Sequence, residues 1–197
     1  MFTGIVRAVG QIEQATVTAD GRRLSIETPR LSDLLAHGDS LSVDGVCLTV
    51  ERIEDGIVTV FLAAETEDRT TLGDRDPGDP VNLEPAMAAT DRFDGHLVQG
   101  HVDTTTTITA IESIGEDWRF TFALPVALDQ YIVEKGSVTI DGISLTVAER
   151  TADTFSIAII PTTYEETTLH GRTVGDSVNL EVDIIAKYVE SMLEARE

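Results

Sequence analysis

The sequence contains a single cysteine, Cys47, so no disulfide bond can form within the chain. Scarce cysteine is typical of proteins in a reducing compartment, and we expect a cytoplasmic protein. No apolar stretch approaches the length of a membrane span, and no secretory signal is visible. The four histidines are scattered, so no cluster has the spacing of metal ligands, and we expect no metal site.

Positive charge is also scarce, because 14 lysines and arginines face 35 aspartates and glutamates, which gives a formal net charge of −21. The lysines are Lys135 and Lys187, and all other basic residues are arginines. Such a surface repels nucleic acid and anionic membranes, so we exclude both as partners. Self-repulsion destabilises the fold at low salt, since the Debye length is about 30 Å at 0.01 M and about 3 Å at 1 M salt. The composition indicates the salt-rich cytoplasm of a halophile, with an ordinary acidic protein as the alternative.

One phrase occurs twice and organises the chain. Residues 40–50 read SLSVDGVCLTV, and residues 137–147 read SVTIDGISLTV. Apolar and polar residues alternate on both sides of an Asp-Gly pair, which predicts two strands joined by a tight hairpin. The alternation places the Cys-Leu-Thr triplet of the first copy and the Ser-Leu-Thr triplet of the second with their polar side chains opposite the core.

Three further motifs recur at nearly the same distance along the chain. They are residues 70–72 repeated at 167–169, residues 78–84 repeated at 175–181, and residues 4–6 repeated at 100–102. The offset is 97 residues for the first two motifs and for the Asp-Gly phrase, and 96 residues for the third. This period is too long for a solenoid repeat, so it indicates a duplicated small domain.

Each half carries many short strands with turn signals between them, which predicts a closed or nearly closed β-barrel in each. The first barrel is expected within residues 1–96, of which residues 86–96 form a linker, and the second within residues 97–183. Short helices are expected at residues 31–36 and 125–131.

The pattern changes after Asp183, which is placed to cap a helix within residues 184–197. Apolar residues recur there at helical spacing: Ile184, Ile185, Tyr188, Val189, Met192 and Leu193. This apolar stripe must be buried, either against the protein's own barrel or against other copies of the chain. We favour self-association.

Several motifs together identify a family. They are the opening MFTGIV, the duplicated DGxxLTV, GHV at 100–102, two TTL triplets and the closing VNLEVD. In this order they resemble riboflavin synthases of the duplicated lumazine-binding-domain type, over essentially the whole chain. The resemblance implies an all-β fold of two similar six-stranded Greek-key β-barrels plus a C-terminal α-helix. It also implies that residues 184–197 are the oligomerisation helix of a homotrimer.

The resemblance further implies a reaction between two molecules of 6,7-dimethyl-8-ribityllumazine. One molecule donates a four-carbon unit to the other, giving riboflavin and 5-amino-6-ribitylamino-pyrimidinedione, without a metal or an organic cofactor. A duplicated domain suits this reaction, because two identical molecules need two similar pockets. Holding them in register supplies much of the acceleration, since effective molarities reach about 10⁵–10⁸ M.

The resemblance assigns roles to residues of both halves. The catalytic residues would be His101, Ser144, Cys47, Asp183 and Thr146. The substrate-binding residues would be Gly4, Ile5, Val6, Cys47, Leu48, Thr49, Leu62, Ala63, Ala64, Glu65, Thr66, Glu67, Gly100, His101, Val102, Lys135, Ser144, Leu145, Thr146, Ile159, Ile160, Pro161, Thr162, Thr163 and Tyr164.

The two pockets are expected to differ. Cys47 would belong to the pocket of the first half, and Ser144 to that of the second half, with His101 beside it. Lys135 would contact the ribityl chain, whereas its repeat partner is Gly38. The polar groups are therefore biased towards the second half, which we expect to assist proton removal.

Each assignment has a simpler alternative. Cys47 suits a buried position as a small hydrophobic residue, and His101 suits a turn. Asp183 caps a helix whether or not it also serves a site. Ser144 and Thr146 suit the exposed face of an edge strand. The remaining histidines lack matching context and are interpreted as surface or structural residues: His37, His96 and His170.

The alternative function is a non-catalytic lumazine- or flavin-binding antenna protein on the same duplicated fold, because a fold does not determine an activity. A purely structural oligomer is less favoured, since the matched polar residues on both strand edges would then serve no purpose.

Overall fold

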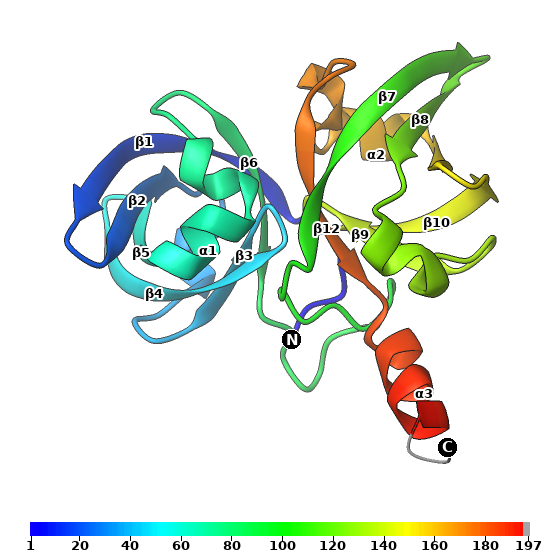
Figure 1. The fold of residues 1–197 in the computed structure, drawn as a ribbon. Coiled ribbons are helices and arrows are strands. Elements are labelled where there is room, and N and C mark those ends of the chain that lie inside the picture. Colours follow the sequence, from blue (N-terminus) through cyan, green and yellow to red (C-terminus); the bar gives the residue numbers. More distant parts are fainter. Residues whose placement is uncertain (195–197) are drawn as a thin grey trace.

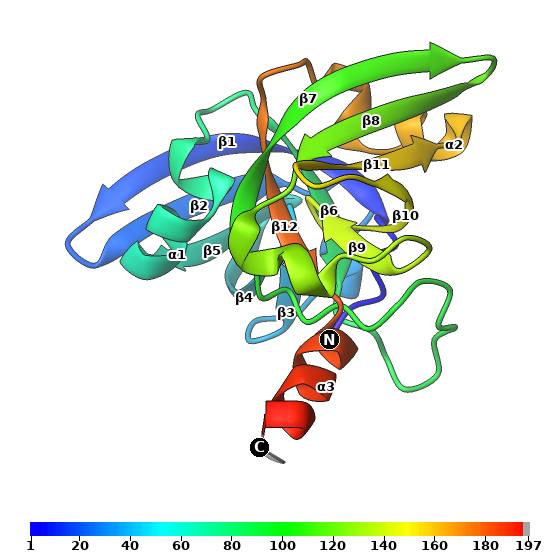
Figure 2. The same cartoon turned by 45° about the vertical axis from the view of Figure 1, so that its right-hand side comes forward.

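The computed structural model describes residues 1–194 and contains two closed six-stranded antiparallel barrels, which lie side by side (Figure 1). A helix at the C-terminal end of the described chain projects away from both barrels, as the turned view also shows (Figure 2). The predicted all-β architecture, with its duplicated barrel and C-terminal helix, is confirmed.

The first barrel has the strand order β1-β2-β5-β4-β3-β6. Its strands are β1 (Ala8–Thr18), β2 (Gly21–Glu27), β3 (Ser40–Val43), β4 (Val46–Glu54), β5 (Ile57–Ala63) and β6 (Pro80–Pro85). Its short helices are η1 (Ser32–Leu34), α1 (Ala64–Arg69) and η2 (Thr71–Asp74).

The second barrel repeats this order as β7-β8-β11-β10-β9-β12 around its circumference. Its strands are β7 (Thr104–Ile114), β8 (Asp117–Ala123), β9 (Ser137–Ile140), β10 (Ile143–Arg150), β11 (Thr154–Ile159) and β12 (Ser177–Val182). Its helices are η3 (Val126–Tyr131), α2 (Pro161–Glu165) and η4 (Thr168–Gly171), followed by α3 (Ile184–Glu194). Each barrel encloses its own apolar core.

The two short helices expected from the sequence are present as the 3₁₀ turns η1 and η3. Helices α1 and α2, which follow directly on β5 and β11, were not predicted. Both have six residues or fewer, so neither is long enough to show a helical period of apolar residues.

The repeated Asp-Gly pairs form the expected two-residue hairpin turns between β3 and β4 and between β9 and β10. Both residues of each turn have positive φ, at 45° and 81° for Asp44 and Gly45, and at 44° and 79° for Asp141 and Gly142. These angles are those of a type I′ turn, which matches the twist of the flanking strands.

The same two turns form the joint between the barrels. Gly45 and Gly142 pack so closely that a Cβ on Gly45 would lie 2.7 Å from the nitrogen of Gly142. Asn82 of β6 donates to the carbonyl of Asp141 at 2.9 Å, and Asn179 of β12 donates to the carbonyl of Asp44 at 2.8 Å. The contacts are reciprocal, so an approximate twofold axis relates the two barrels.

Two aspartates and two arginines meet at this joint. Arg75 donates to Asp44 at 2.9 Å, Arg172 donates to Asp141 at 2.6 Å, and both carboxylates are fully buried. Burial, with the adjacent Asp44 carboxylate, raises the pKa of Asp141 to about 7. Because this pKa exceeds that of an unfolded aspartate, the folded protein binds the Asp141 proton more tightly than the unfolded chain does. The stability that this proton contributes is fully present below the unfolded pKa of 3.8 and is lost as the pH rises through about 7.

Helix α3 contacts the second barrel through its polar side. Glu190 accepts hydrogen bonds from Gln130 and Tyr131 of η3, and Lys187 donates to Asp103 at 2.5 Å. The predicted apolar stripe is left open, with the side chains most exposed to solvent being Ile185, Tyr188, Val189, Met192 and Leu193. The described part of α3 therefore does not bury this stripe on its own barrel, and residues 195–197 of the predicted helix lie outside the described chain. No helix within residues 1–194 combines the length and apolarity needed to cross a membrane.

Candidate functional site

The turn that precedes each barrel attaches to the other barrel. The amide of Ser144 on β10 donates to the carbonyl of Gly4 at 2.7 Å, and the amide of Cys47 on β4 donates to the carbonyl of Gly100 at 2.8 Å. A Cβ on Gly4 would lie 2.6 Å from the Cβ of Ser144, and one on Gly100 would lie 2.6 Å from that of Cys47. Both glycines also have φ near +80°, so glycine is required at these two positions.

Because each turn attaches to the other barrel, the two turns are exchanged between the barrels, and the pockets differ in composition from the expectation. Val6 packs against the core of the second barrel, and Val102 packs against the core of the first. His101 therefore lies beside Cys47 and not beside Ser144, so the pairing expected from the sequence is wrong within one chain. This exchange could not be predicted, because both turns look alike in sequence and either could have served either barrel.

Buried glutamates of the repeated Val-Asn-Leu-Glu motif hold the two turns. Glu84 accepts hydrogen bonds from the amides of Thr3 and Gly4 at 2.7 Å and 2.9 Å, and also from the Thr3 hydroxyl. Burial raises the pKa of Glu84, although these hydrogen bonds oppose the shift. The carboxylate thereby fixes the turn whose carbonyl contacts Ser144.

Glu181 performs the same task at the second turn. It accepts hydrogen bonds from the amides of Gln99, Gly100 and His101 at 2.7 Å, 3.0 Å and 2.9 Å. Burial also raises the pKa of Glu181. The last residue of this motif therefore holds the backbone of pocket residues without lining the pocket itself, which explains why the motif occurs in both halves.

The first pocket lies at one end of β4 and has a volume of about 210 Å³. It is lined by Val46, Cys47, Glu65, Thr66, Arg69, Thr70, Gly100, His101 and Val102. Six of the predicted site residues come together there, and two of them, Glu65 and Thr66, lie on α1. The side chain of Cys47 is partly exposed, so it can reach a bound ligand.

The second pocket is expected at the equivalent place on β10. A histidine that was not among the predicted site residues lies there. His96 is buried, with its Nδ1 atom 2.6 Å from the hydroxyl of Ser144 and its Nε2 atom 3.2 Å from that of Thr139. Burial lowers the pKa of His96, while the negative charge of Asp183 opposes this shift. A neutral imidazole bonded to a hydroxyl is the arrangement of a general base beside a nucleophile or proton carrier.

The prediction that His96 is only a surface or structural residue is therefore incomplete, because His96 contacts the predicted site residue Ser144. His96 lies in the linker, outside the motifs that recur in the two halves. Comparison of the two repeats could not reveal it. By contrast, His37 and His170 are exposed, as expected.

Seven other predicted residues occupy three kinds of position. Thr49 and Thr146 are exposed on the outer faces of β4 and β10, as the alternation predicts. The side chains of four residues point into the barrel cores, so only their backbone groups can contact a ligand there: Leu48, Leu62, Leu145 and Ile159. Asp183 accepts a hydrogen bond from the amide of Ile185 at 2.9 Å and so caps α3, as one interpretation expected.

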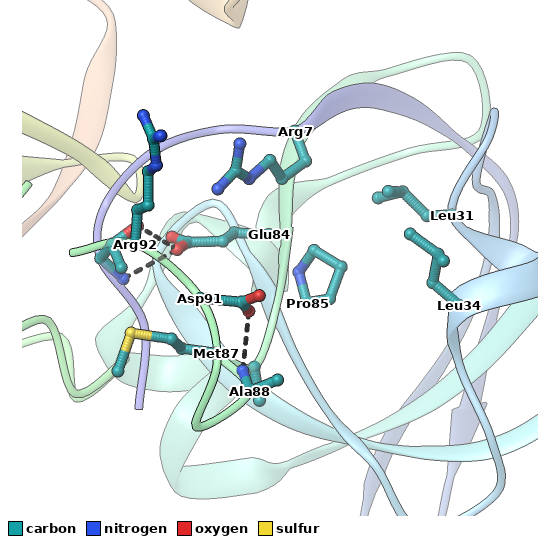
Figure 3. A pocket seen from close by; sticks show the side chains of 11 residues that line it. Arg7, Leu31, Leu34, Glu84, Pro85, Met87, Ala88, Asp91 and Arg92 are labelled. Atoms are coloured by element: carbon teal, nitrogen blue, oxygen red, sulfur yellow. Dashed lines mark hydrogen bonds between the residues drawn. The ribbon is translucent and has the colours of Figure 1, made fainter. Parts of the chain in front are cut away.

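A further cavity of about 470 Å³ lies between the linker and η1 (Figure 3). Glu84 forms part of its wall, together with Arg7, Asp91 and Arg92 (Figure 3). None of the predicted site residues lines it, and its two arginines are balanced by two carboxylates, so we assign it no part in the reaction. Within residues 1–194, no group of three or more His, Cys, Asp and Glu side chains is arranged to hold a metal ion.

Comparison with known proteins agrees with this geometry. The family model described as "Lumazine binding domain" matches residues 3–86 and again residues 99–183. Solved structures of LumP complexed with 6,7-dimethyl-8-(1'-D-ribityl) lumazine and with riboflavin superpose with TM-scores of 0.84 and 0.86. They cover 92% of this chain and 99% of LumP at 24% identity, and so show the shared fold. The chain is thus a protein of two lumazine-binding domains.

Full-length relatives narrow this class further. The riboflavin synthase of Mycobacterium tuberculosis is 46% identical over 200 residues, which cover 99% of this chain and 99% of that protein. The riboflavin synthase of Schizosaccharomyces pombe is 43% identical, covering 99% and 95%, and that of Bacillus subtilis is 41% identical, covering 98% and 90%. The chain belongs to the riboflavin synthase family, transferases of riboflavin biosynthesis.

Proposed function

We propose that this protein synthesises riboflavin by the dismutation of two molecules of 6,7-dimethyl-8-ribityllumazine. The observation that carries the proposal is the pair of similar strand-edge sites, each completed by a glycine turn from the other half. The relationship to full-length riboflavin synthases supports it. One lumazine transfers a four-carbon unit to the other, and the products are riboflavin and 5-amino-6-ribitylamino-pyrimidinedione.

The two sites would have different tasks in this reaction. In the second half, the His96 imidazole would accept a proton from the acidic C7 methyl group, directly or through the Ser144 hydroxyl. The resulting carbanion would attack the second lumazine, which Cys47 and His101 would hold in the first half. Asp183 supports the proton transfer, because its negative charge favours the protonated form of His96.

The proposal includes a homotrimer in which the first-half site of one subunit faces the second-half site of its neighbour. The exposed apolar stripe of α3 supports this assembly, since burying it against other copies removes large apolar side chains from water. Face-to-face sites would bring the two lumazines to reacting distance, which the chemistry requires.

Incubation of the purified protein with the lumazine alone tests the activity. We expect riboflavin absorbance to appear without added metal, nucleotide or flavin, and to be unaffected by a chelator. Titration of lumazine fluorescence in the same samples measures binding separately. Tight binding without turnover would contradict the proposed activity and place the protein with non-catalytic antenna proteins.

We also propose that the protein works in the salt-rich cytoplasm of a halophile. The net charge of −21 supports this, because dilute buffer leaves the repulsion between surface carboxylates unscreened. We expect the melting temperature and the activity to rise steeply from low salt to molar KCl. A melting temperature that stays constant over this range would contradict the halophile assignment and leave the proposed activity untouched.

A further inference from the structure

A β-bulge occurs at the same place in both barrels, beside the candidate sites. In β4 the register with β5 shifts between Val50 and Arg52, which leaves Glu51 as the extra residue. In β10 the register with β11 shifts between Val147 and Glu149, which leaves Ala148 as the extra residue. The extra residue of a bulge has no partner in the strand ladder, so its carbonyl needs another hydrogen-bond donor.

A side chain from the preceding loop supplies that donor in each barrel. In the second half, the Lys135 ammonium donates to the carbonyl of Ala148 at 3.4 Å. In the first half, Nδ1 of His37 donates to the carbonyl of Glu51 at 2.9 Å. Ala148 and Glu51 are repeat partners, because 148 − 51 = 97. Lys135 and His37 therefore approach equivalent carbonyls, although they are not repeat partners themselves.

The loop backbone explains why His37 takes the place of a lysine in the first half. The amide of Lys135 donates to the carbonyl of Val147 at 2.8 Å, and the amide of its repeat partner Gly38 donates to the carbonyl of Val50 at 2.9 Å. The two loops thus have the same hydrogen bonding, but Gly38 has no side chain. His37, one residue earlier, places its ring where the lysine acts in the other half.

The His37 ring has a second nitrogen available for a ligand. Its Nδ1 atom is committed to the Glu51 carbonyl, while its Nε2 atom has no hydrogen-bond partner within residues 1–194, and the residue is exposed. The Glu51 carboxylate does not compete for the ring, because Arg23 donates to it at 2.8 Å. On the same strand, Cys47 and Thr49 present their side chains away from the core.

We propose that His37 binds the ribityl chain of the lumazine held in the first half, as Lys135 is expected to do in the second half. This inference rests on the proposed function, which supplies the ligand. A hydroxyl group both donates and accepts, so Nε2 can bind a ribityl hydroxyl in either protonation state of the ring. His37 is a binding and positioning residue in this scheme and takes no part in proton transfer.

The test compares His37→Ala and His37→Lys with His170→Ala in the full-length protein. His170 is the matched control, because it is exposed like His37 and its Nδ1 atom also lies against a backbone carbonyl, that of Thr167 at 2.6 Å. Lumazine binding is followed by fluorescence titration, KM and kcat by riboflavin absorbance, and stability by thermal unfolding.

We expect His37→Ala to weaken lumazine binding and to raise KM about three- to tenfold, the range for loss of one hydrogen bond. His37→Lys should restore both values, and His170→Ala should change neither. Lower stability of His37→Ala with unchanged binding and KM would show that the ring only satisfies the bulge carbonyl, which overturns the proposal. A wild-type protein that binds lumazine without turnover would contradict the proposed function, while weaker binding by His37→Ala would still support this site.

Discussion

A chain that ends at Asp183 should keep both barrels folded, bind lumazine weakly and lose nearly all riboflavin synthesis. The barrel cores and the joint between the barrels lie within residues 1–182, so removal of α3 leaves them intact. The truncation removes the exposed stripe, and with it the proposed contact between subunits that would bring two sites together. Light scattering and a riboflavin assay in high salt would measure both effects.

A pair of single substitutions makes this test more specific. Tyr188→Glu places a charge on the exposed apolar stripe, whereas Ser191→Glu places the same charge on an exposed position of α3 outside it. We expect the first variant to be monomeric and nearly inactive, and the second to behave as the wild type. A monomeric truncation with undiminished turnover would show that one chain forms the whole site.

The second large effect is expected at the contact between His96 and Ser144. Ser144→Ala and His96→Gln should each lower kcat about 10²–10⁴-fold, which is typical of the loss of a positioned acid–base group. Fold stability, measured as the melting temperature, should change much less than turnover. His170→Ala, which removes an exposed imidazole, should leave kcat near the wild-type value.

The pH dependence of kcat provides an independent measurement. Burial lowers the pKa of His96, so the neutral ring should persist below the ordinary histidine value of 6.5. Wild-type kcat should therefore fall only on the acidic side of that value, and His96→Gln should remove this limb of the profile. If His170→Ala reduced turnover as much as His96→Gln, the assignment of the site would be wrong.

The sequence predicted those features that depend on local pattern. Alternation and the Asp-Gly pairs predicted the hairpins, and the repeat predicted two barrels, because strand period and turn chemistry are properties of neighbouring residues. The same alternation placed Thr49 and Thr146 on the outer faces of their strands, where the structure has them.

Features that depend on contacts between the halves could not be predicted. His101 lies with Cys47 because the turns cross between barrels, and no local pattern distinguishes a crossing turn from one that stays. His96 was not predicted as a site residue because it lies in a linker without a repeat partner. Only the structure shows that it is buried against Ser144. The roles of the site residues stay predictions until the variants are measured.

The exchange of turns between the barrels has a consequence for the protein's ancestry. Neither half contains all the groups that shape its own pocket, since each borrows a glycine carbonyl from the other. The joint is also self-complementary, because the same Asp-Gly and Asn groups meet on both sides. These are the properties of an isologous dimer, in which one patch pairs with a copy of itself. A single ancestral half could therefore have completed its pocket by dimerising, and fusion of two copies then left each free to acquire its own polar residues, such as His96 in the linker and Lys135 in the second half.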